Sequence, residues 1–225
     1  LNVGLWTSPH ILSIRERFHY DQDISYGELR EEIYKTHDIL KSKHGDLKIS
    51  FYEFLFLVFL RVSLFSNEDK NLEHLILEVG LGGRLDAVNH FDADCACITS
   101  ISRDHQGILG NRFDLILNEK IAVSRSGAPL FTQFALNYLN GLTKEYCKKN
   151  GVLWKPIEKD INSSGNYFEE NQQMALALFK HFEPSEKLKN LSEIPIFKGR
   201  REEMTFKGNT LIFIGAHNID GVRKM

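Results

Sequence analysis

Short runs of apolar residues alternate along the chain with longer segments in which apolar residues recur every three or four positions. The short runs are typical of buried strands, and the longer segments are typical of amphipathic helices. Their alternation predicts an α/β fold with a mostly parallel sheet flanked by helices. The expected strands are 3–6, 75–79, 96–101, 129–134, 152–154 and 210–214. The expected helices are 26–43, 51–65, 112–124, 137–150 and 169–182.

Two of these helices begin with a capping box, in which a serine and a glutamate three residues later satisfy each other's backbone amides. The pairs are Ser25 with Glu28 and Ser50 with Glu53. The helix over 51–65 is apolar on nearly every side, so we expect it to be buried. Capping accounts for the charge of Glu53, whereas Arg61 remains a polar group that needs an explanation.

The spacing of turn residues suggests where the chain divides. Proline, asparagine, serine and glycine mark a loop over 155–170, and the polar stretch 184–195 is compatible with a domain boundary. We therefore expect one domain over 1–194, followed over 195–225 by a linker and the first strand of a second domain. The sequence has no initiator methionine and opens on a strand pattern, so we expect it to be a piece of a longer protein.

Composition narrows the classes of partner. The 225 residues carry 28 Lys and Arg against 30 Asp and Glu, a net charge of −2, which lacks the basic excess of nucleic-acid-binding proteins. The longest apolar run, residues 54–60, is far shorter than the roughly 20 residues that cross a bilayer, so no membrane span is expected. Cys95, Cys97 and Cys147 lack CxxC spacing, and we expect reduced thiols in a cytoplasmic protein.

Polar residues follow four of the predicted strands. They are Thr7 to His10, Glu78 to Asp86, Ser102 to His105 and Gly215 to Asn218. In an open α/β sheet, ligands bind beyond the carboxyl ends of the strands, so we expect these four loops to share one rim.

Glu78 is the most informative residue of this rim, because a carboxylate at the end of an apolar strand is costly to desolvate unless it is paired or bound to a cation. With the Ser8 hydroxyl and His105 it would form an oxygen-rich site for Mg²⁺ or Mn²⁺. The alternative is a structural carboxylate that accepts hydrogen bonds from loop amides.

The other rim residues each allow two interpretations. The glycines of 80–83 indicate either close approach to a ligand or a plain tight turn. Asp104 could simply orient His105, without any metal. His217 and Asn218 could bind phosphate at a helix start or could only cap that helix. Lys120, taken alone, is an ordinary surface lysine.

Taken in order along the chain, these motifs are far more specific. They comprise residues 7–10 (Thr-Ser-Pro-His), 15–17 (Arg-Glu-Arg), 50–53 (Ser-Phe-Tyr-Glu), 78–89 (Glu-Val-Gly-Leu-Gly-Gly-Arg-Leu-Asp-Ala-Val-Asn), 104–105 (Asp-His), 119–120 (Glu-Lys), 199–200 (Gly-Arg) and 215–218 (Gly-Ala-His-Asn). This series resembles the folylpolyglutamate synthase and dihydrofolate synthase family, which belongs to the Mur ligase superfamily. The segments 50–53 and 86–87 favour this folate branch over a peptidoglycan-type Mur ligase.

The resemblance implies an ATP-dependent amide ligase that adds L-glutamate to dihydropteroate, to folates, or to both. In the implied mechanism the γ-phosphate of ATP is transferred to a carboxylate, and the glutamate amine then displaces phosphate from the acyl phosphate. A monomeric, Mur-ligase-like central ATP-binding domain over 1–194, with the start of a C-terminal ligase domain, is implied as well.

The resemblance also implies roles for individual residues. Ser8, Glu78 and His105 match the family's magnesium ligands, and Lys120 matches a lysine that is carbamylated in related ligases and can then help to hold the metal. Glu78, His105 and Lys120 are thereby implied in catalysis. Residues implied to bind the pterin or folate are Arg15, Tyr52, Asp86 and Ala87, with Tyr52 standing where the family usually has phenylalanine. Residues implied to bind ATP are Arg200, His217 and Asn218.

Some family features are missing from the sequence. It contains no Gly-Lys-Ser or Gly-Lys-Thr, the signature of the phosphate-binding loop that precedes the Thr-Ser-Pro-His motif in the family. Ile214 stands in place of an aspartate, and Ile219 in place of a proline. We therefore expect a fragment of such a ligase, with a catalytically inactive truncated remnant that at most binds pterin or folate as the alternative.

Overall fold

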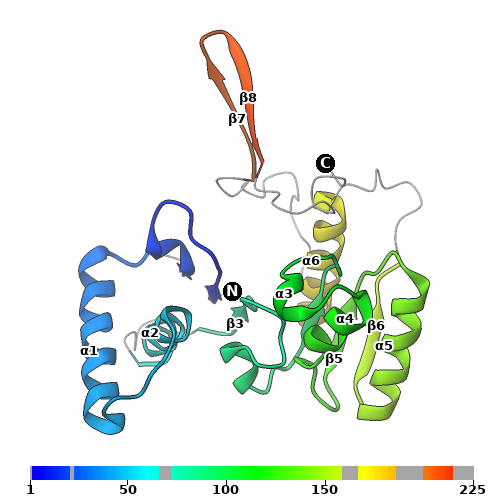
Figure 1. Ribbon diagram of the computed structural model, residues 1–225, viewed down its shortest axis with the longest axis horizontal. Coiled ribbons are helices and arrows are strands. Elements are labelled where there is room, and N and C mark those ends of the chain that lie inside the picture. The colour runs from blue at the N-terminus through cyan, green and yellow to red at the C-terminus, as the bar shows by residue number, and fades with distance from the viewer. Residues whose placement is uncertain (1, 21–22, 66–71, 159–166, 186–199, 215–225) are drawn as a thin grey trace. The chain divides into compact units, whose positions relative to one another are not determined.

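The computed structural model describes residues 2–20, 23–65, 72–158, 167–185 and 200–214 (Figure 1). The chain divides into two compact units, Leu1–Phe91 and Asp92–Met225. Among the helices in these ranges, none combines the length and the apolar character that crossing a membrane requires.

The first unit is a small sheet covered by two helices. Its elements are β1 (Val3–Trp6), η1 (Ile14–Arg17), β2 (Phe18–His19), α1 (Tyr26–His44), α2 (Phe51–Phe65), β3 (His74–Leu77) and η2 (Ala87–His90). The strand order is β2-β1-β3, with β1 antiparallel to β2 and parallel to β3. Helix α2 packs against β1, and α1 packs against α2. In Figure 1, α2 is seen nearly end-on while α1 runs lengthwise, so the two helices cross steeply.

Aromatic side chains fill the core of this unit. Trp6 is fully buried, and the ring centroids of Phe18, Tyr52, Phe56 and Phe59 lie 5.6 to 5.8 Å from its own. Tilted and edge-on pairs at this spacing add to the hydrophobic gain of burying large rings. The middle of α2 is buried as its sequence predicts, while Phe51, Leu64 and Phe65 at its ends are exposed.

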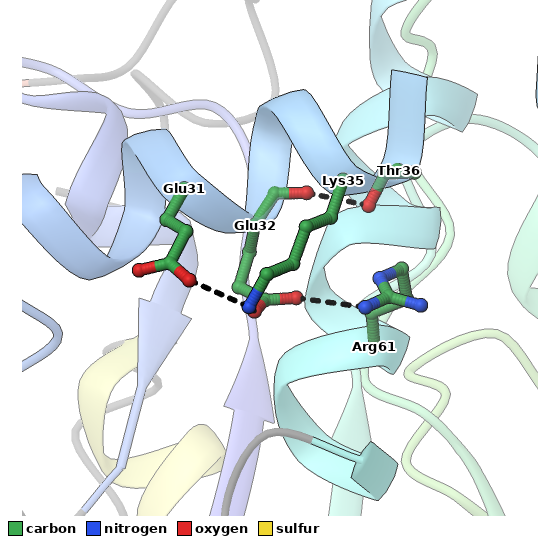
Figure 2. Close-up of polar contacts among 5 residues, drawn as sticks. All are labelled: Glu31, Glu32, Lys35, Thr36 and Arg61. Carbon is green, nitrogen blue, oxygen red and sulfur yellow. Dashed lines mark hydrogen bonds and ion pairs between the residues drawn. The ribbon is translucent and has the colours of Figure 1, made fainter. Parts of the chain in front are cut away.

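A partly buried ion pair joins the two helices. Glu32 of α1, with only 7% of its side chain exposed, accepts from the Nη2 of Arg61 on α2 at 3.2 Å and from the Nζ of Lys35 at 3.0 Å. Figure 2 shows Lys35 placed between Glu31 and Glu32, with Arg61 reaching Glu32 from the second helix. The ion pair supplies the explanation that Arg61 required.

Replacing Arg61 by alanine is expected to lower the free energy of unfolding of the first unit by about 2 kcal/mol, because Glu32 keeps a buried charge and loses its inter-helix partner. Lys35 still pairs with Glu32 in this variant, which reduces the loss of stability. The matched variant Lys35→Ala removes a half-exposed cation from the same carboxylate and is expected to cost less than about 1 kcal/mol. Urea unfolding of both variants checks this order, and equal losses would contradict it.

The second unit contains a parallel sheet and an antiparallel hairpin. Its elements are β4 (Ala96–Ile98), α3 (Gln106–Leu109), α4 (Phe113–Ile121), β5 (Pro129–Thr132), α5 (Asn137–Asn150), β6 (Leu153–Pro156), α6 (Tyr167–Phe182), β7 (Arg200–Phe206) and β8 (Asn209–Ile214). The sheet has the order β4-β5-β6, with all neighbours parallel. Every residue of the central strand β5 is buried, as expected of a parallel strand that is covered on both faces.

The mixed α/β fold predicted from the sequence, with parallel strands flanked by helices, is confirmed. Helices α2 and α5 and strand β1 have the predicted ends, and both predicted capping boxes form. Strands β2 and β7 and helix α3 were not anticipated. The predicted boundary near residue 194 falls outside the described residues, so the division into 1–194 and 195–225 stays a prediction.

Of the four loops predicted to share one rim, the structure brings together those that follow β1 and β3, which are parallel neighbours. The loop 102–105 belongs to the second unit and residues 215–218 lie outside the described residues, so a shared rim for these two stays a prediction. β8 pairs antiparallel with β7 in a separate two-stranded sheet, instead of extending the parallel strands. An antiparallel hairpin needs only the two-residue turn at Lys207 and Gly208, where both residues have positive φ. The predicted strand 210–214 therefore forms, but it pairs with a neighbouring strand that the sequence analysis did not recognise.

Candidate functional site

The carboxyl ends of β1 and β3 lie side by side in the first unit, as predicted. The register pairs Trp6 with Leu77, so Ser8 and Glu78 leave the sheet next to each other. The backbone N–H of Ser8 donates to Glu78 Oε2 at 2.6 Å, and the N–H of Glu78 donates to the carbonyl of Trp6 at 3.0 Å. Glu78 is exposed, so its carboxylate can meet a ligand from solvent. The hydrogen bond from a loop amide agrees with a structural role for the Glu78 carboxylate. Its position beside Ser8 agrees with a role as a metal ligand.

Glu16 organises the loop that follows β1. Its carboxylate accepts from the backbone N–H groups of Ile11, Leu12 and Ser13 at 2.7, 3.0 and 2.7 Å. Ser13 and Glu16 form a third capping box, at the start of η1. These N–H donors, that of Ile11 above all, hold the pKa of Glu16 below its ordinary value. The signal Ser-x-x-Glu was present at 13–16 in the sequence and was missed because the helix it caps has a single turn.

Arg15 and Arg17 of η1 turn to different neighbours. The Nη1 of Arg15 donates to the carbonyl of Ile24 at 3.1 Å, and its guanidinium lies 4.2 Å from the ring centroid of Tyr26. Arg17 is buried, donates through Nε to His10 Nδ1 at 2.9 Å and lies near the Trp6 ring. Burial lowers the pKa of Arg17, and the nearby Tyr52 and Glu78 oppose that shift. Arg15 thus contacts Ile24 and Tyr26 of its own unit. Its binding of the pterin or folate stays a prediction.

Asp86 fixes the glycine-rich loop that follows β3. It is buried, and its Oδ2 accepts from the N–H groups of Gly80 and Leu81, both at 3.1 Å. Its Oδ1 accepts from the N–H of Val88 at 3.0 Å and from the Tyr52 hydroxyl at 3.1 Å. Asp86 also caps η2, the short helix that begins at Ala87. The structure therefore brings Tyr52, Asp86 and Ala87 together, while the implied contact with a pterin stays a prediction.

In the second unit, Asp104 and His105 form a local pair. The backbone N–H of His105 donates to Asp104 Oδ1 at 2.8 Å, and its Nε2 lies 3.9 Å from the same oxygen. His105 has a φ of 50°, in the left-handed region that non-glycine residues rarely adopt, and it immediately precedes α3. Its side chain is half exposed.

Lys120 is only partly exposed on α4, so it is not the ordinary surface lysine that it resembles when taken alone. Burial lowers the pKa of Lys120, and the negative charge of Asp104 opposes that shift. A lowered pKa gives a larger share of neutral amine at a given pH, which is the form that reacts with CO₂.

The predicted metal ligands are divided between the units. Ser8 and Glu78 belong to the first unit and His105 and Lys120 to the second. Among the described residues, no three His, Cys, Asp or Glu side chains are grouped as a metal site would need. For the predicted ATP contacts, the structure describes only the backbone of Arg200, at the start of β7, and His217 and Asn218 lie outside the described residues.

Comparison with known proteins shows what this chain is similar to. The chain is 33% identical over 133 residues to a putative folylpolyglutamate synthase of Caenorhabditis elegans, a match that covers 58% of this chain and 25% of that protein. It spans about a quarter of the length of the curated relatives it matches. No family model matches the chain.

The solved structures agree. A bifunctional folylpolyglutamate synthase/dihydrofolate synthase with Mn, AMPPNP and L-glutamate bound superposes with a TM-score of 0.77 at 28% identity. The alignment covers 99% of this chain and 58% of that one. Escherichia coli FolC in complex with DHPP and ADP gives a TM-score of 0.78 at 26% identity, over 98% of this chain and 56% of that one. The chain therefore resembles the folylpolyglutamate synthase and dihydrofolate synthase family in both sequence and fold, as its motifs predicted.

Proposed function

We propose that the protein containing this chain is an ATP-dependent ligase that adds L-glutamate to dihydropteroate, to folates, or to both. The observation that carries the proposal is the contact between Ser8 and Glu78, 70 residues apart, at the adjoining carboxyl ends of β1 and β3. These two residues belong to the motifs at 7–10 and 78–89, and their meeting at one sheet edge fits ligand binding there. Similar solved proteins bind an ATP analogue with L-glutamate, or ADP with DHPP.

The proposed reaction has two steps. A carboxylate oxygen of the pterate or folate attacks the γ-phosphorus of ATP, the bond to the β,γ-bridging oxygen breaks, and an acyl phosphate and ADP form. The amine nitrogen of glutamate then attacks the acyl carbon, phosphate leaves, and the nitrogen loses a proton to give the amide. Both steps depend on positioning and on positive charge near the phosphoryl oxygens.

Ser8 and Glu78, which the first unit brings together, carry ligand atoms that suit a divalent metal. The Glu78 carboxylate and Ser8 hydroxyl are hard oxygen ligands, and His105 would add a nitrogen that suits Mn²⁺ better than Mg²⁺. When bound, the ion would supply charge against the phosphoryl group. Glu78 would be held for this task by the Ser8 amide, which fixes one of its oxygens at the sheet edge.

Lys120 would contribute a further anion. Its neutral amine would attack the carbon of CO₂ and lose a proton, so that a carbamate replaces the ammonium and can help to hold the metal. The partly buried position of Lys120 on α4 and the burial that lowers its pKa favour this reaction.

Incubation with ¹³C-bicarbonate is expected to label Lys120 as a carbamate, and labelling is expected to grow as the pH rises, because more of the amine is then neutral. The measurement is the carbamate carbon signal in the NMR spectrum. Lys120→Ala should abolish the signal, whereas Lys144→Ala, which removes an exposed lysine of α5, should leave it intact. A signal that survives in Lys120→Ala would contradict the assignment.

Substrate dependence of ADP release tests the function itself. The full-length protein is expected to release ADP only when pterate or folate, L-glutamate and Mg²⁺ are all present. Release that does not depend on glutamate would overturn the proposal.

A second candidate, an inactive remnant that at most binds pterin or folate, is favoured by Ile214, which stands in place of the family's aspartate. It predicts that this chain binds pteroate without turning over ATP, and detectable turnover by the chain would exclude it.

A further inference from the structure

Within the proposed function, we infer that Tyr52 and Asp86 are positioning residues that hold the glycine-rich loop 80–86 in place, and that neither offers its polar atoms to the substrate. The family resemblance assigns both residues to pterin contact. Their hydrogen bonds in this chain indicate different roles. Tyr52 and Asp86 hold the loop, and the loop backbone and Ala87 contact the substrate.

The acceptor capacity of Asp86 is used up within the protein. An ionised carboxylate has about four acceptor sites. Those of Asp86 are filled by the N–H groups of Leu81 and Val88, by the hydroxyl of Tyr52 and by the N–H of Gly80, at 3.0 to 3.1 Å. The Gly80 N–H is shared between Asp86 and the Tyr52 hydroxyl. With 8% of the residue exposed, the carboxylate is enclosed as well as saturated. The N–H donors of a pteridine would have to displace one of these internal bonds.

The hydroxyl of Tyr52 is equally committed. A phenol has one donor and two acceptor sites. It donates to Asp86 Oδ1 and accepts from Trp6 Nε1 at 3.3 Å and from the Gly80 N–H at 3.1 Å, with a longer contact of 3.4 Å to the carbonyl of Glu78. Burial raises its pKa to about 12, with the Asp86 charge acting in the same direction, so it remains a neutral donor. Tyr52 thus links the aromatic core to the loop.

The ring of Tyr52 packs closely against the backbone of Gly80. A Cβ added at Gly80 would lie 2.8 Å from two carbons of this ring, a separation that real side chains do not reach. Gly80 is therefore required for the close approach of the loop to α2. Phenylalanine, the usual family residue, would keep this packing but could not donate a hydrogen bond to Asp86. The bond from Tyr52 to Asp86 is therefore a property of this chain.

Amide hydrogen exchange on the ligand-free chain tests the inference. The acceptor of the Leu81 N–H is the carboxylate of Asp86, which Tyr52→Phe leaves in the chain. If Tyr52 positions Asp86, this variant should speed exchange at Leu81 by about 3- to 10-fold, the equivalent of one hydrogen bond. Asp86→Asn should speed it at least as much, because its NH₂ group faces other donors, and the double variant should fall short of the product of the two effects.

Tyr34→Phe is the matched control, since Tyr34 is an exposed tyrosine of α1. It should leave exchange at Leu81 unchanged. Exchange in α2 should stay constant in all these variants, which separates a local loop effect from a loss of global stability. Unchanged exchange at Leu81 in Tyr52→Phe would overturn the inference.

Ligand discrimination separates positioning from direct contact. Pteroate and its 2-desamino analogue differ by one donor group on the pteridine ring. If Asp86 only positions the loop, Asp86→Asn and Tyr52→Phe weaken the binding of both ligands by the same factor. If Asp86 accepts from the pteridine, Asp86→Asn removes the preference for pteroate; a gain of pteroate affinity in Tyr52→Phe would likewise overturn the inference.

A failure of the proposed function would give a different result from a failure of this inference. Should the chain bind neither ligand, the folate assignment is in error, while the exchange rates at Leu81 still decide whether Tyr52 positions Asp86.

Discussion

Replacement of Trp6 by alanine is expected to lower the free energy of unfolding of the first unit by about 3 to 5 kcal/mol. Trp6 is fully buried, touches four aromatic rings and donates its indole N–H to Tyr52. Its loss leaves a cavity that the rigid neighbouring rings cannot close, and it removes a donor from the Tyr52 hydroxyl. The transfer cost and the cavity cost therefore add.

Native-state hydrogen exchange of the amides in β1 and α2 measures the effect, with amides of β5 in the second unit as an internal reference. Trp6→Phe keeps an aromatic ring and loses the indole donor, so about 1 to 2 kcal/mol is expected for it. Trp154→Phe removes the other tryptophan, which donates to Thr132 in the second unit, and should leave the first unit unchanged. A loss below about 1 kcal/mol in Trp6→Ala would show that the ring cluster is not the centre of the core.

Replacement of Glu78 by glutamine is expected to weaken the binding of Mn²⁺ at least about 100-fold, because loss of groups that merely support metal ligands already costs 10- to 100-fold. The substitution keeps the shape and an oxygen that can accept from the Ser8 N–H, so the fold should be retained. What it removes is the negative charge at the sheet edge.

Titration followed by the electron paramagnetic resonance of free Mn²⁺ measures the affinity, and ADP release measures the consequence in the full-length protein. Glu73→Gln makes the same change of charge next to the same strand, at an exposed glutamate that accepts from the Asn2 N–H, and should bind Mn²⁺ as before. Equal affinity in Glu78→Gln and the unchanged protein would leave Glu78 with a structural role only.

Most of the secondary structure could be predicted because local chemistry decides it. The starts of α1 and α2 follow from capping serines and glutamates that bond to amides three residues away. Strand β5 follows from an apolar run that is buried on both faces. The two-residue strand β2 and the single-turn helix α3 could not be predicted, since they are too short to leave a periodic signal. Helix η1 is as short, and only its capping box at Ser13 and Glu16 indicates it in the sequence.

The candidate site, too, could be predicted from the sequence only in part. The sequence determined by itself which residue types follow each strand, and the order of those motifs was enough to indicate the family. Only the tertiary structure decided which partners those residues take. The bond from Ser8 to Glu78 spans 70 residues, and the bonds from Tyr52 to Asp86 and from Trp6 to Tyr52 span 34 and 46. Hydrogen bonds at such separations depend on strand register and helix packing, which no local pattern encodes. The chemical candidates therefore came from the sequence, and the packing of α2 against the sheet decided that Tyr52 bonds to Asp86.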